Sequence, residues 1–256
     1  MSRAVAEGSS PDTGAPLYYV GTSGWAYREW RSRWYPRKLP TREWLRFYAQ
    51  HFPTVELNST FYRLPPPERF QFWKHSVPKT FRFAVKAPRL ITHGRQLHAD
   101  GELLHTFMQA ISLLGAQLGP VLWQFPPQYA CAIELLRAFL PMLPPTVEHA
   151  FEFRHPSWDN SEVWHLLRSA GIALVWSSSL RYPCFRNQTA PFLYVRFHGL
   201  KGGYAHQYTD DELQPWAELL ADAIRRGCRA YVYFNNTAGT APQDALHFRE
   251  LLEARL

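Results

Sequence analysis

The sequence predicts a single (β/α)8 barrel, and three observations lead to that prediction. Eight short runs rich in aromatic and β-branched residues recur along the chain, each bounded by Gly, Pro, Asn or Ser, as β-strands are. Longer helical segments separate most of these runs, an alternation typical of parallel α/β folds. The length of 256 residues suits one barrel, and 46% hydrophobic residues suffice for its core. We therefore expect an α/β fold with one domain over 17–256, preceded by a flexible tail over 1–16.

The elements are expected in regular alternation along the chain. The predicted strands are 17–21, 54–58, 81–87, 120–125, 148–153, 172–177, 192–198 and 230–235. The predicted helices are 41–51, 66–76, 100–118, 133–140, 161–170, 210–226 and 243–255. Thr209 followed by Glu212 fits a capping box, and Gly227 supplies a stop, so one helix has both ends defined. The connector SSSLRYPCFRNQTAP lacks helical periodicity, and we expect an irregular loop there.

Alternation within the strands predicts a polar barrel mouth. Successive side chains of a strand face opposite ways, so Val55 and Leu57 oppose Glu56. Six strands repeat this pattern, and we assign the apolar face to the helices and the polar face to the interior. The inward polar set is Glu56, Asn58, Lys86, Gln124, Glu152, Arg154, Arg196, His198 and Asn235. Most of these residues lie near the C-terminal ends of strands, where barrels of this kind carry their active sites.

Two interpretations of this mouth remain open. Its ionised members sum to a net charge of +1, which favours an anion such as phosphate, carboxylate or sulfate. Burying an ion costs several kcal/mol, so the charges need either a ligand or partners. The alternative is therefore a network that satisfies itself, for example with Glu56 paired to Lys86 and Glu152 paired to Arg196.

The first half of the chain is strongly basic. The protein carries a net charge of +7, and residues 25–95 alone contain 15 Lys or Arg against 4 Asp or Glu. Aromatic and basic residues interleave in GTSGWAYREWRSRWYPRK, a composition that suits stacked bases with nearby phosphates, or sugar rings. Trp25, next to glycines that permit close approach of a ligand, is the candidate ligand-facing ring. The other tryptophans there are expected to seal the barrel.

Composition also excludes several classes of protein. No apolar run approaches the ~18 residues of a membrane span, so no membrane partner is expected. Residues 1–16 contain no apolar core of signal-peptide length. The three cysteines are odd in number, widely spaced and without a CxxC motif, which argues against a disulfide framework and a cysteine zinc site. A cytoplasmic location is the expectation that follows.

Seven motifs, in order, resemble one known family. They are GTSGWAYREW, TVELNSTFYRLP, FRFAVKAPRLITH, PVLWQFPP, FEFRHPSW, YVRFHGLKGGY and YFNNTAG, and the chain is similar over 17–256 to the YecE-like family, a domain of unknown function (DUF 72). The resemblance implies a TIM barrel but no reaction; the family's barrel has been likened to endonuclease IV and to sugar-phosphate isomerases. Carried over residue by residue, its motifs mark Glu56, Asn58, Tyr62, Lys86, Gln124, Glu152, Arg154, Trp158, Arg196, His198, Gly199, Asn235 and Asn236.

The chain departs from the family pattern at two places. Similar proteins tend to end the sixth strand with aspartate, whereas this chain has Ser177–Ser179. They also tend to place asparagine before the last helix, where this chain has Asp244. Loss of the strand-end aspartate weakens any metal site built from several carboxylates.

A metal site remains an alternative to a metal-free mouth. The candidate ligands are Glu56, His93, Glu152, His155 and His198, since His with carboxylate suits zinc, manganese or iron. These residues show no HxH or HExxH spacing, and Arg154 and Lys86 beside the carboxylates would compete with a cation. We therefore predict no cofactor, with a divalent metal as the alternative.

Three functions are compatible with these residues. The first is an enzyme that acts on an anionic substrate, preferably a nucleic-acid phosphodiester; Lys86, Arg154 and Arg196 would hold the anion. In that enzyme Glu56 or Glu152 is the candidate base and His198 assists in proton transfer. The other anion or substrate contacts would come from Trp25, Asn58, Tyr62, Gln124, Trp158, Asn235 and Asn236. The second function is a non-catalytic nucleic-acid-binding barrel, and the third is a metal-independent phosphosugar isomerase or lyase.

Overall fold

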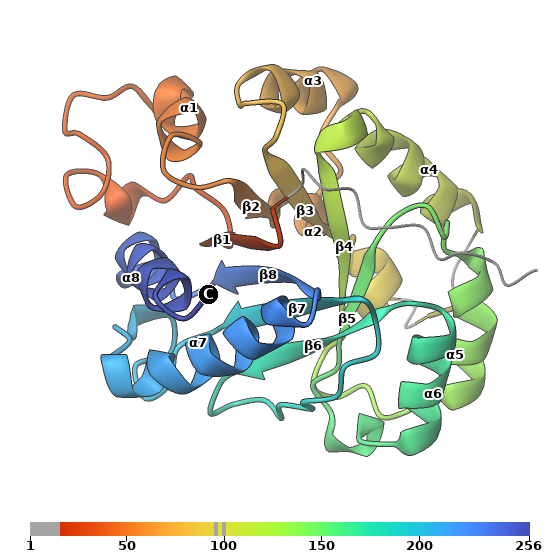
Figure 1. Ribbon diagram of the computed structural model, residues 1–256. Coiled ribbons are helices and arrows are strands. Elements are labelled where there is room, and N and C mark those ends of the chain that lie inside the picture. The colour runs from red at the N-terminus through yellow and green to blue at the C-terminus, as the bar shows by residue number, and fades with distance from the viewer. Residues whose placement is uncertain (1–15, 95–96, 99–100) are drawn as a thin grey trace, which may run out of the picture.

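The computed structural model shows eight parallel strands arranged as a nearly closed barrel with helices around it (Figure 1). The structure describes residues 16–94, 97–98 and 101–256. The strand order is β1-β8-β7-β6-β5-β4-β3-β2, and an isolated bridge between Ser23 and Glu56 links β1 to β2. The strands are β1 Tyr18–Thr22, β2 Thr54–Leu57, β3 Arg82–Lys86, β4 Leu118–Gln124, β5 His149–Glu152, β6 Ala173–Ser178, β7 Phe192–Phe197 and β8 Arg229–Phe234. All eight predicted strands are confirmed.

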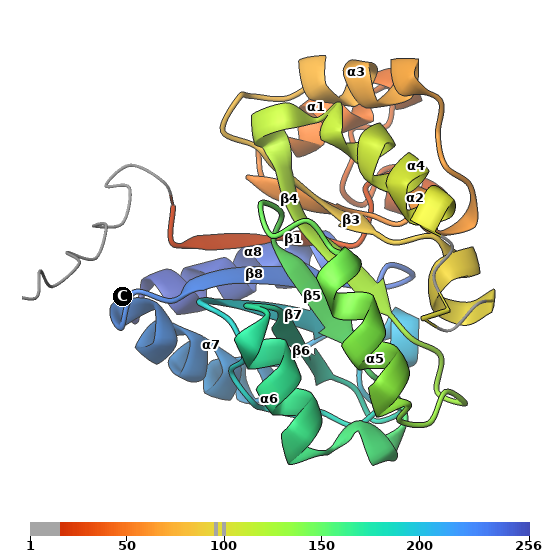
Figure 2. The same ribbon diagram turned by 90° about the vertical axis from the view of Figure 1, so that its right-hand side faces the viewer.

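The helices cover the outside of the barrel (Figures 1 and 2). They are α1 Trp44–Tyr48, α2 Ser59–Tyr62, α3 Pro67–His75, α4 Gly101–Ser112, α5 Ile133–Phe139, α6 Ser161–Ser169, α7 Asp210–Arg225 and α8 Ala241–Glu253. Helix α8 contacts β1 and β8 and so covers the junction between the first and last strands. The predicted capping box at Thr209 and Glu212 is confirmed, as is the irregular connector between β6 and β7. No helix in the described part of the chain has both the length and the apolar character that crossing a bilayer requires.

Two predicted helices have the wrong extent and one short helix was not predicted, each for a local reason. The helix expected over 100–118 ends at Ser112 because Gly115 has a positive φ of 58°, and Leu118 belongs to β4. The helix expected over 41–51 is split into the 3-10 turn Thr41–Glu43 and the short α1. Helix α2 spans only four residues, too few for its periodicity to show in the sequence. The predicted tail, 1–16, lies outside the described residues except for residue 16.

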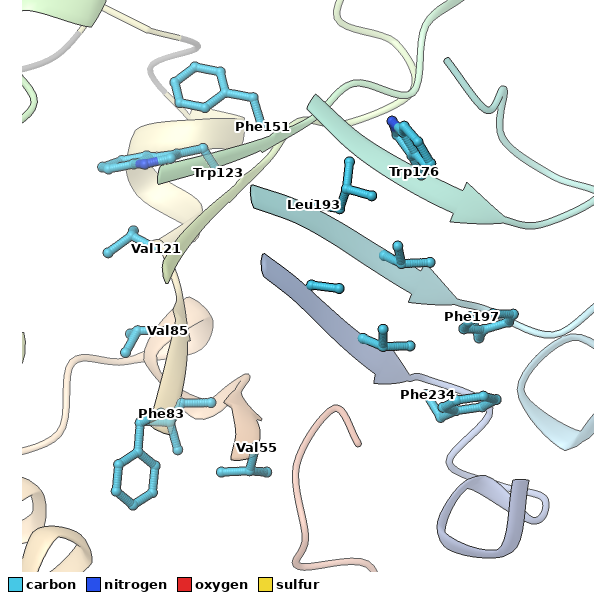
Figure 3. Packing of buried hydrophobic residues seen from close by; sticks show 14 of the residues in the cluster. Val55, Phe83, Val85, Val121, Trp123, Phe151, Trp176, Leu193, Phe197 and Phe234 are labelled. Atoms are coloured by element: carbon cyan, nitrogen blue, oxygen red, sulfur yellow. The ribbon is translucent and has the colours of Figure 1, made fainter. Parts of the chain in front are cut away.

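Alternation along the strands separates two buried layers. The outward side chains, including Val85, Val121 and Phe197, pack in the cluster between strands and helices (Figure 3). The inward side chains form a second cluster in which large rings from β1, β7 and β8 face small residues from β3, β5 and β6. Tyr19 and Tyr231 stack there with ring centroids 5.0 Å apart. These rings fill the interior and lie between the charged side chains at the C-terminal ends of the strands and those at the opposite end, where Arg229 pairs with Glu148.

Candidate functional site

A buried guanidinium joins two buried carboxylates across the mouth of the barrel. Arg196 on β7 donates from Nη2 to Oε1 of Glu56 at 2.7 Å and from Nη1 to Oε2 of Glu152 at 2.5 Å. All three side chains are almost completely buried. The predicted pair of Glu152 with Arg196 is confirmed. The predicted pair of Glu56 with Lys86 is wrong, because the long Arg196 side chain reaches across the interior to β2 and replaces the lysine.

Every contact of Glu56 stabilises its ionised form. Its Oε1 also accepts a hydrogen bond from Ser23 Oγ at 2.8 Å, and its Oε2 accepts one from the Tyr194 hydroxyl at 2.7 Å. Burial on its own would raise the pKa of Glu56, but the charge and hydrogen bonds of Arg196 outweigh burial and lower that pKa. Burial and the charge of Glu56 hold the pKa of Tyr194 well above its ordinary value. Glu56 is therefore ionised, and each of its oxygens accepts at least one hydrogen bond.

Glu152 is held in the same way. Its Oε1 accepts from Nε of Arg154 at 2.8 Å and lies 3.1 Å from Nε2 of His198. Burial would raise its pKa, but the charges of Arg154 and Arg196 bring it well below the ordinary value. The Nδ1 atom of His198 lies 3.0 Å from the side-chain amide of Asn235, which assigns the ring proton to Nε2 and makes His198 a donor to Glu152. Burial lowers the pKa of His198 to about 4, so the ring is neutral at pH 7.

Lys86 differs from the other ionisable groups of the mouth. It ends β3, is half-buried, and makes no side-chain hydrogen bond or ion pair with the described residues. Its Nζ lies 3.9 Å from the centroid of the Phe61 ring. Burial, followed by the positive charge of Arg196, lowers the pKa of the amine to about 7. The mouth therefore contains a balanced network of two glutamates and two arginines, and beside it an amine that has no ion-pair partner within 16–94, 97–98 and 101–256.

Tyr182, which the sequence did not single out, covers one side of this network. It lies in the irregular connector between β6 and β7, and its ring contacts both Arg154 and His198. The Arg154 side chain keeps only 10% of its surface exposed under this ring. The space beside Tyr182 and His198 is only about 10 Å³, too small for a ligand. The sequence offered one indication of Tyr182: it is an aromatic residue in a connector without a helix, directly after a barrel strand.

Two of the predicted contact residues lie away from the mouth. Trp158 is completely buried and stacks on Phe153 with centroids 4.0 Å apart, while its Nε1 donates to the carbonyl of Tyr129. It packs in the core because the turn Pro156–Trp158 directs it back between the strands and helices. Asn236 is also buried and donates to Asp244 Oδ2 at 2.6 Å. Both side chains are therefore buried in contacts with the rest of the fold.

The remaining predicted contacts are scattered around the mouth. Gln124 is buried and donates to the backbone carbonyl of Phe125 at 2.8 Å. Tyr62 on α2 is 81% exposed.

Asp244, the departure from the family pattern, accepts hydrogen bonds from Asn236 and Thr240 and thereby fixes the loop that follows β8.

The candidate metal ligands do not gather around one point. Glu152 and His198 are in contact, but both are held by the network described above. His93 lies 2.9 Å from Thr92 Oγ1 and edge-on to Phe61, and His155 contacts Ser157. In the described part of the chain, no three His, Cys, Asp or Glu side chains are placed to hold a metal ion.

A pocket of about 580 Å³ lies beside the mouth, between the segment after β1 and helices α1 to α3. Trp25 and Asn58, both predicted contact residues, line it. The Oδ1 atom of Asn58 is buried and has no hydrogen-bond partner among the described residues. The pocket and the mouth adjoin, since the backbone N–H of Gly24 in the pocket wall donates to the carbonyl of Glu56 at 2.8 Å.

Comparison with solved structures supports the barrel. A DUF72 family protein from Thermotoga maritima superimposes with a TM-score of 0.84 at 32% identity, covering 92% of this chain and 99% of that one. A DUF72 family protein from Enterococcus faecalis gives a TM-score of 0.80 at 22% identity, covering 92% of this chain and 95% of that one. At 22% identity, the similarity to the Enterococcus faecalis protein supports the fold only.

Comparison of sequences identifies the family. The chain is 28% identical to the UPF0759 protein YunF of Bacillus subtilis, over 93% of this chain and 95% of that protein. It is 31% identical to the UPF0759 protein YecE of Escherichia coli K12, over 56% of this chain and 50% of that protein. The family described as "Protein of unknown function DUF72" matches residues 19–256. The chain therefore belongs to the DUF72 family and adopts its TIM-barrel fold.

Proposed function

We propose that the barrel mouth binds a small ligand through its phosphate or carboxylate group, and that Lys86 exchanges a proton with that ligand. The observation that carries this proposal is the charge balance of the mouth. Each of the two arginines is paired with a carboxylate, whereas Lys86 has no counterion among the described residues. An unpaired cation at the C-terminal end of a barrel strand favours an anion.

The glutamates and the histidine support the site without acting on the ligand. The oxygens of Glu56 and Glu152 accept hydrogen bonds from charged or hydroxyl donors, and both ring nitrogens of His198 have partners. A general base must reach the proton it removes, and these side chains are almost completely buried and already paired within the network. We assign them the positioning of Arg196 and Arg154 and give proton transfer to Lys86.

The chemistry that this amine suits is proton transfer at a carbon or oxygen acid. With a pKa of about 7, both the charged and the neutral amine are present at neutral pH. The charged form attracts the anion, and the neutral form removes a proton, the step that isomerases and lyases need. A metal-independent reaction on a phosphorylated small molecule is therefore favoured over phosphodiester hydrolysis, because the two glutamates of the mouth are buried and ion-paired and so are poorly placed to activate water.

Calorimetric titration with inorganic phosphate tests the anion site. We expect phosphate to bind the wild-type protein, and to bind Lys86→Met about tenfold more weakly or worse, since the change removes the unpaired charge. Lys79→Met is the matched control, because Lys79 is exposed just before β3 and should leave binding unchanged. Equal binding by Lys86→Met and wild type, or no binding by either, would sink the proposal.

A second candidate function is nucleic-acid binding, and one observation favours it. Arg28, Arg33, Arg37 and Lys38 are exposed in the segment after β1 and make no ion pair with the described residues. Exposed cations in one segment suit a polyanion. Binding of a single-stranded oligonucleotide should then weaken steeply with salt, and the salt slope should fall in Arg33→Ala/Arg37→Ala. A slope unchanged by that double variant would exclude this segment as the contact.

A further inference from the structure

The pocket beside the mouth has the size and lining of a ligand site. Its volume of about 580 Å³ lies in the range of small-molecule sites, roughly 300–1,000 Å³. Its walls come from the segment after β1, from α1, from the start of α2 and from α3. The lining residues that bear on recognition are Trp25, Arg42, Asn58, Arg69, Phe72 and Trp73.

Aromatic rings fixed by the fold form much of the wall. Trp25 packs edge-on against Trp73, with centroids 5.7 Å apart and planes at 90°. The carbonyl of Trp25 accepts a hydrogen bond from the Tyr35 hydroxyl at 2.7 Å, which holds the backbone of this wall in place. Phe72 lines the pocket with 47% of its surface exposed. Fixed, partly exposed rings favour a flat ligand ring that stacks against them.

The amide of Asn58 is a polar group in this wall that has no hydrogen-bond partner in the described part of the chain. Among the described residues, none donates a hydrogen bond to its buried Oδ1 and none accepts one from its Nδ2. A buried polar group without a hydrogen bond is costly. Six buried side-chain atoms of the described residues have no hydrogen-bond partner, and Asn58 is the one residue among them that lines this pocket. Rotation about the last torsion of Asn58 would turn this amide toward the pocket, where it would offer both a donor and an acceptor to a ligand.

Two arginines stand at the rim of the pocket. Arg69 is exposed and makes no ion pair with the described residues. The Arg42 side chain is 80% exposed, and its contact with Glu43 is long, at 3.7 Å. Exposed guanidinium groups of this kind are available to an anion on the ligand.

We propose that this pocket binds a nucleoside phosphate, with the base stacked on the aromatic wall and the phosphate near Arg69. Asparagine pairs with adenine through the donor and acceptor at N6 and N7, which matches the unpartnered amide of Asn58. Adenine is therefore the base we assign. The inference goes beyond the phosphate site at Lys86 and does not depend on it, since the base contacts involve no residue of the charged network.

Calorimetric titrations with adenosine, AMP and ribose 5-phosphate test the assignment. We expect adenosine to bind, and AMP to bind more tightly, because AMP adds the contact with Arg69. Asn58→Leu should weaken the binding of both adenosine and AMP by about tenfold and leave the binding of inorganic phosphate unchanged, because only the amide is lost. Arg69→Met should weaken the binding of AMP but not that of adenosine. Phe72→Ala, an exposed position that leaves the fold intact, should weaken adenosine, whereas Leu90→Ala, with a similar exposure of 52%, should not.

Three results would overturn the inference. They are no adenosine binding by the wild-type protein, adenosine binding unchanged in both Asn58→Leu and Phe72→Ala, and ribose 5-phosphate binding as tight as that of AMP. If the protein binds phosphate but not adenosine, the nucleoside pocket alone is rejected. If it binds adenosine but phosphate binding does not depend on Lys86, the proposed function of the mouth alone is rejected.

Discussion

The guanidinium of Arg154 lies against the face of the Tyr182 ring, with its central carbon 4.0 Å from the ring centroid. The same guanidinium donates to Glu152, so one side chain carries a salt bridge on its edge and an aromatic ring on its face. Tyr182 belongs to a connector without helix or strand, and this contact ties that connector to the charged network. The ring therefore controls how much of Arg154 a ligand can reach.

Tyr182→Leu should expose Arg154. The change removes a largely buried cation–π contact worth about 1–2 kcal/mol, so stability should fall by a similar amount. Phenylglyoxal, which modifies exposed arginines, should then react faster at Arg154, as peptide mapping by mass spectrometry would show. Modification at Arg33, which is exposed already, is the internal reference. An unchanged rate at Arg154 would mean that Tyr182 does not cover it in solution.

Arg196→Met should destabilise the protein strongly. It leaves Glu56 and Glu152 buried without their shared counterion, and breaking a buried pair in this way costs about 3–5 kcal/mol. Urea denaturation would measure the loss, with Arg33→Met as the exposed control. The triple variant Arg196→Met/Glu56→Gln/Glu152→Gln should recover part of the loss, because the buried charges are gone. A loss below about 1 kcal/mol would show that water or rearrangement compensates the carboxylates.

Lys86→Met should stabilise the protein at neutral and lower pH. The folded amine has a pKa of about 7 against an ordinary 10.5, so the unfolded chain holds this proton more tightly. Stability of the wild type should therefore rise with pH between these two values, and the penalty is fully present below about 7. After allowance for partial exposure, we expect a gain on the order of 1 kcal/mol at pH 6 that disappears near pH 10. Thermal denaturation at both pH values measures it, and a variant less stable than wild type at pH 6 would contradict the assignment.

Sulfate, used as the ligand in place of phosphate, shows the effect of the Lys86 protonation state on binding without a change in the charge of the ligand. Phosphate changes its own charge near neutral pH, whereas sulfate does not. Because the amine loses its charge as the pH rises through about 7, the affinity for sulfate should fall over that interval. Binding titrations at pH 6 and pH 9 would show the fall, and Lys86→Arg, which keeps its charge, should remove it. A pH-independent affinity in the wild type would place the anion elsewhere.

The alternation of strand residues predicted most of the mouth. Side chains of a strand repeat every second residue, so Glu56, Glu152 and Arg196 were assigned to the interior from their positions alone. The partners within the mouth were harder to predict, since they depend on reach across the barrel, and Arg196 contacts Glu56 in place of Lys86.

Residues outside the strands were predicted less well. Trp158 follows β5 in a 3-10 turn, where alternation no longer tells which way a side chain points, and it packs in the core. Tyr182 lies in a connector with no periodicity at all, so only the folded chain brings it over Arg154. The unpartnered amide of Asn58 is likewise visible only once every neighbour is in place.

The bridge between Ser23 and Glu56 has a consequence for how the chain is made. The carboxylate at this seam needs Arg196, which a ribosome adds 140 residues later. A nascent chain that has emerged only as far as β5 therefore carries both glutamates without the cation that neutralises them in the finished barrel. Such a fragment gains little by burying these carboxylates, so the seam between β1 and β2 can close stably only after β7 has been synthesised.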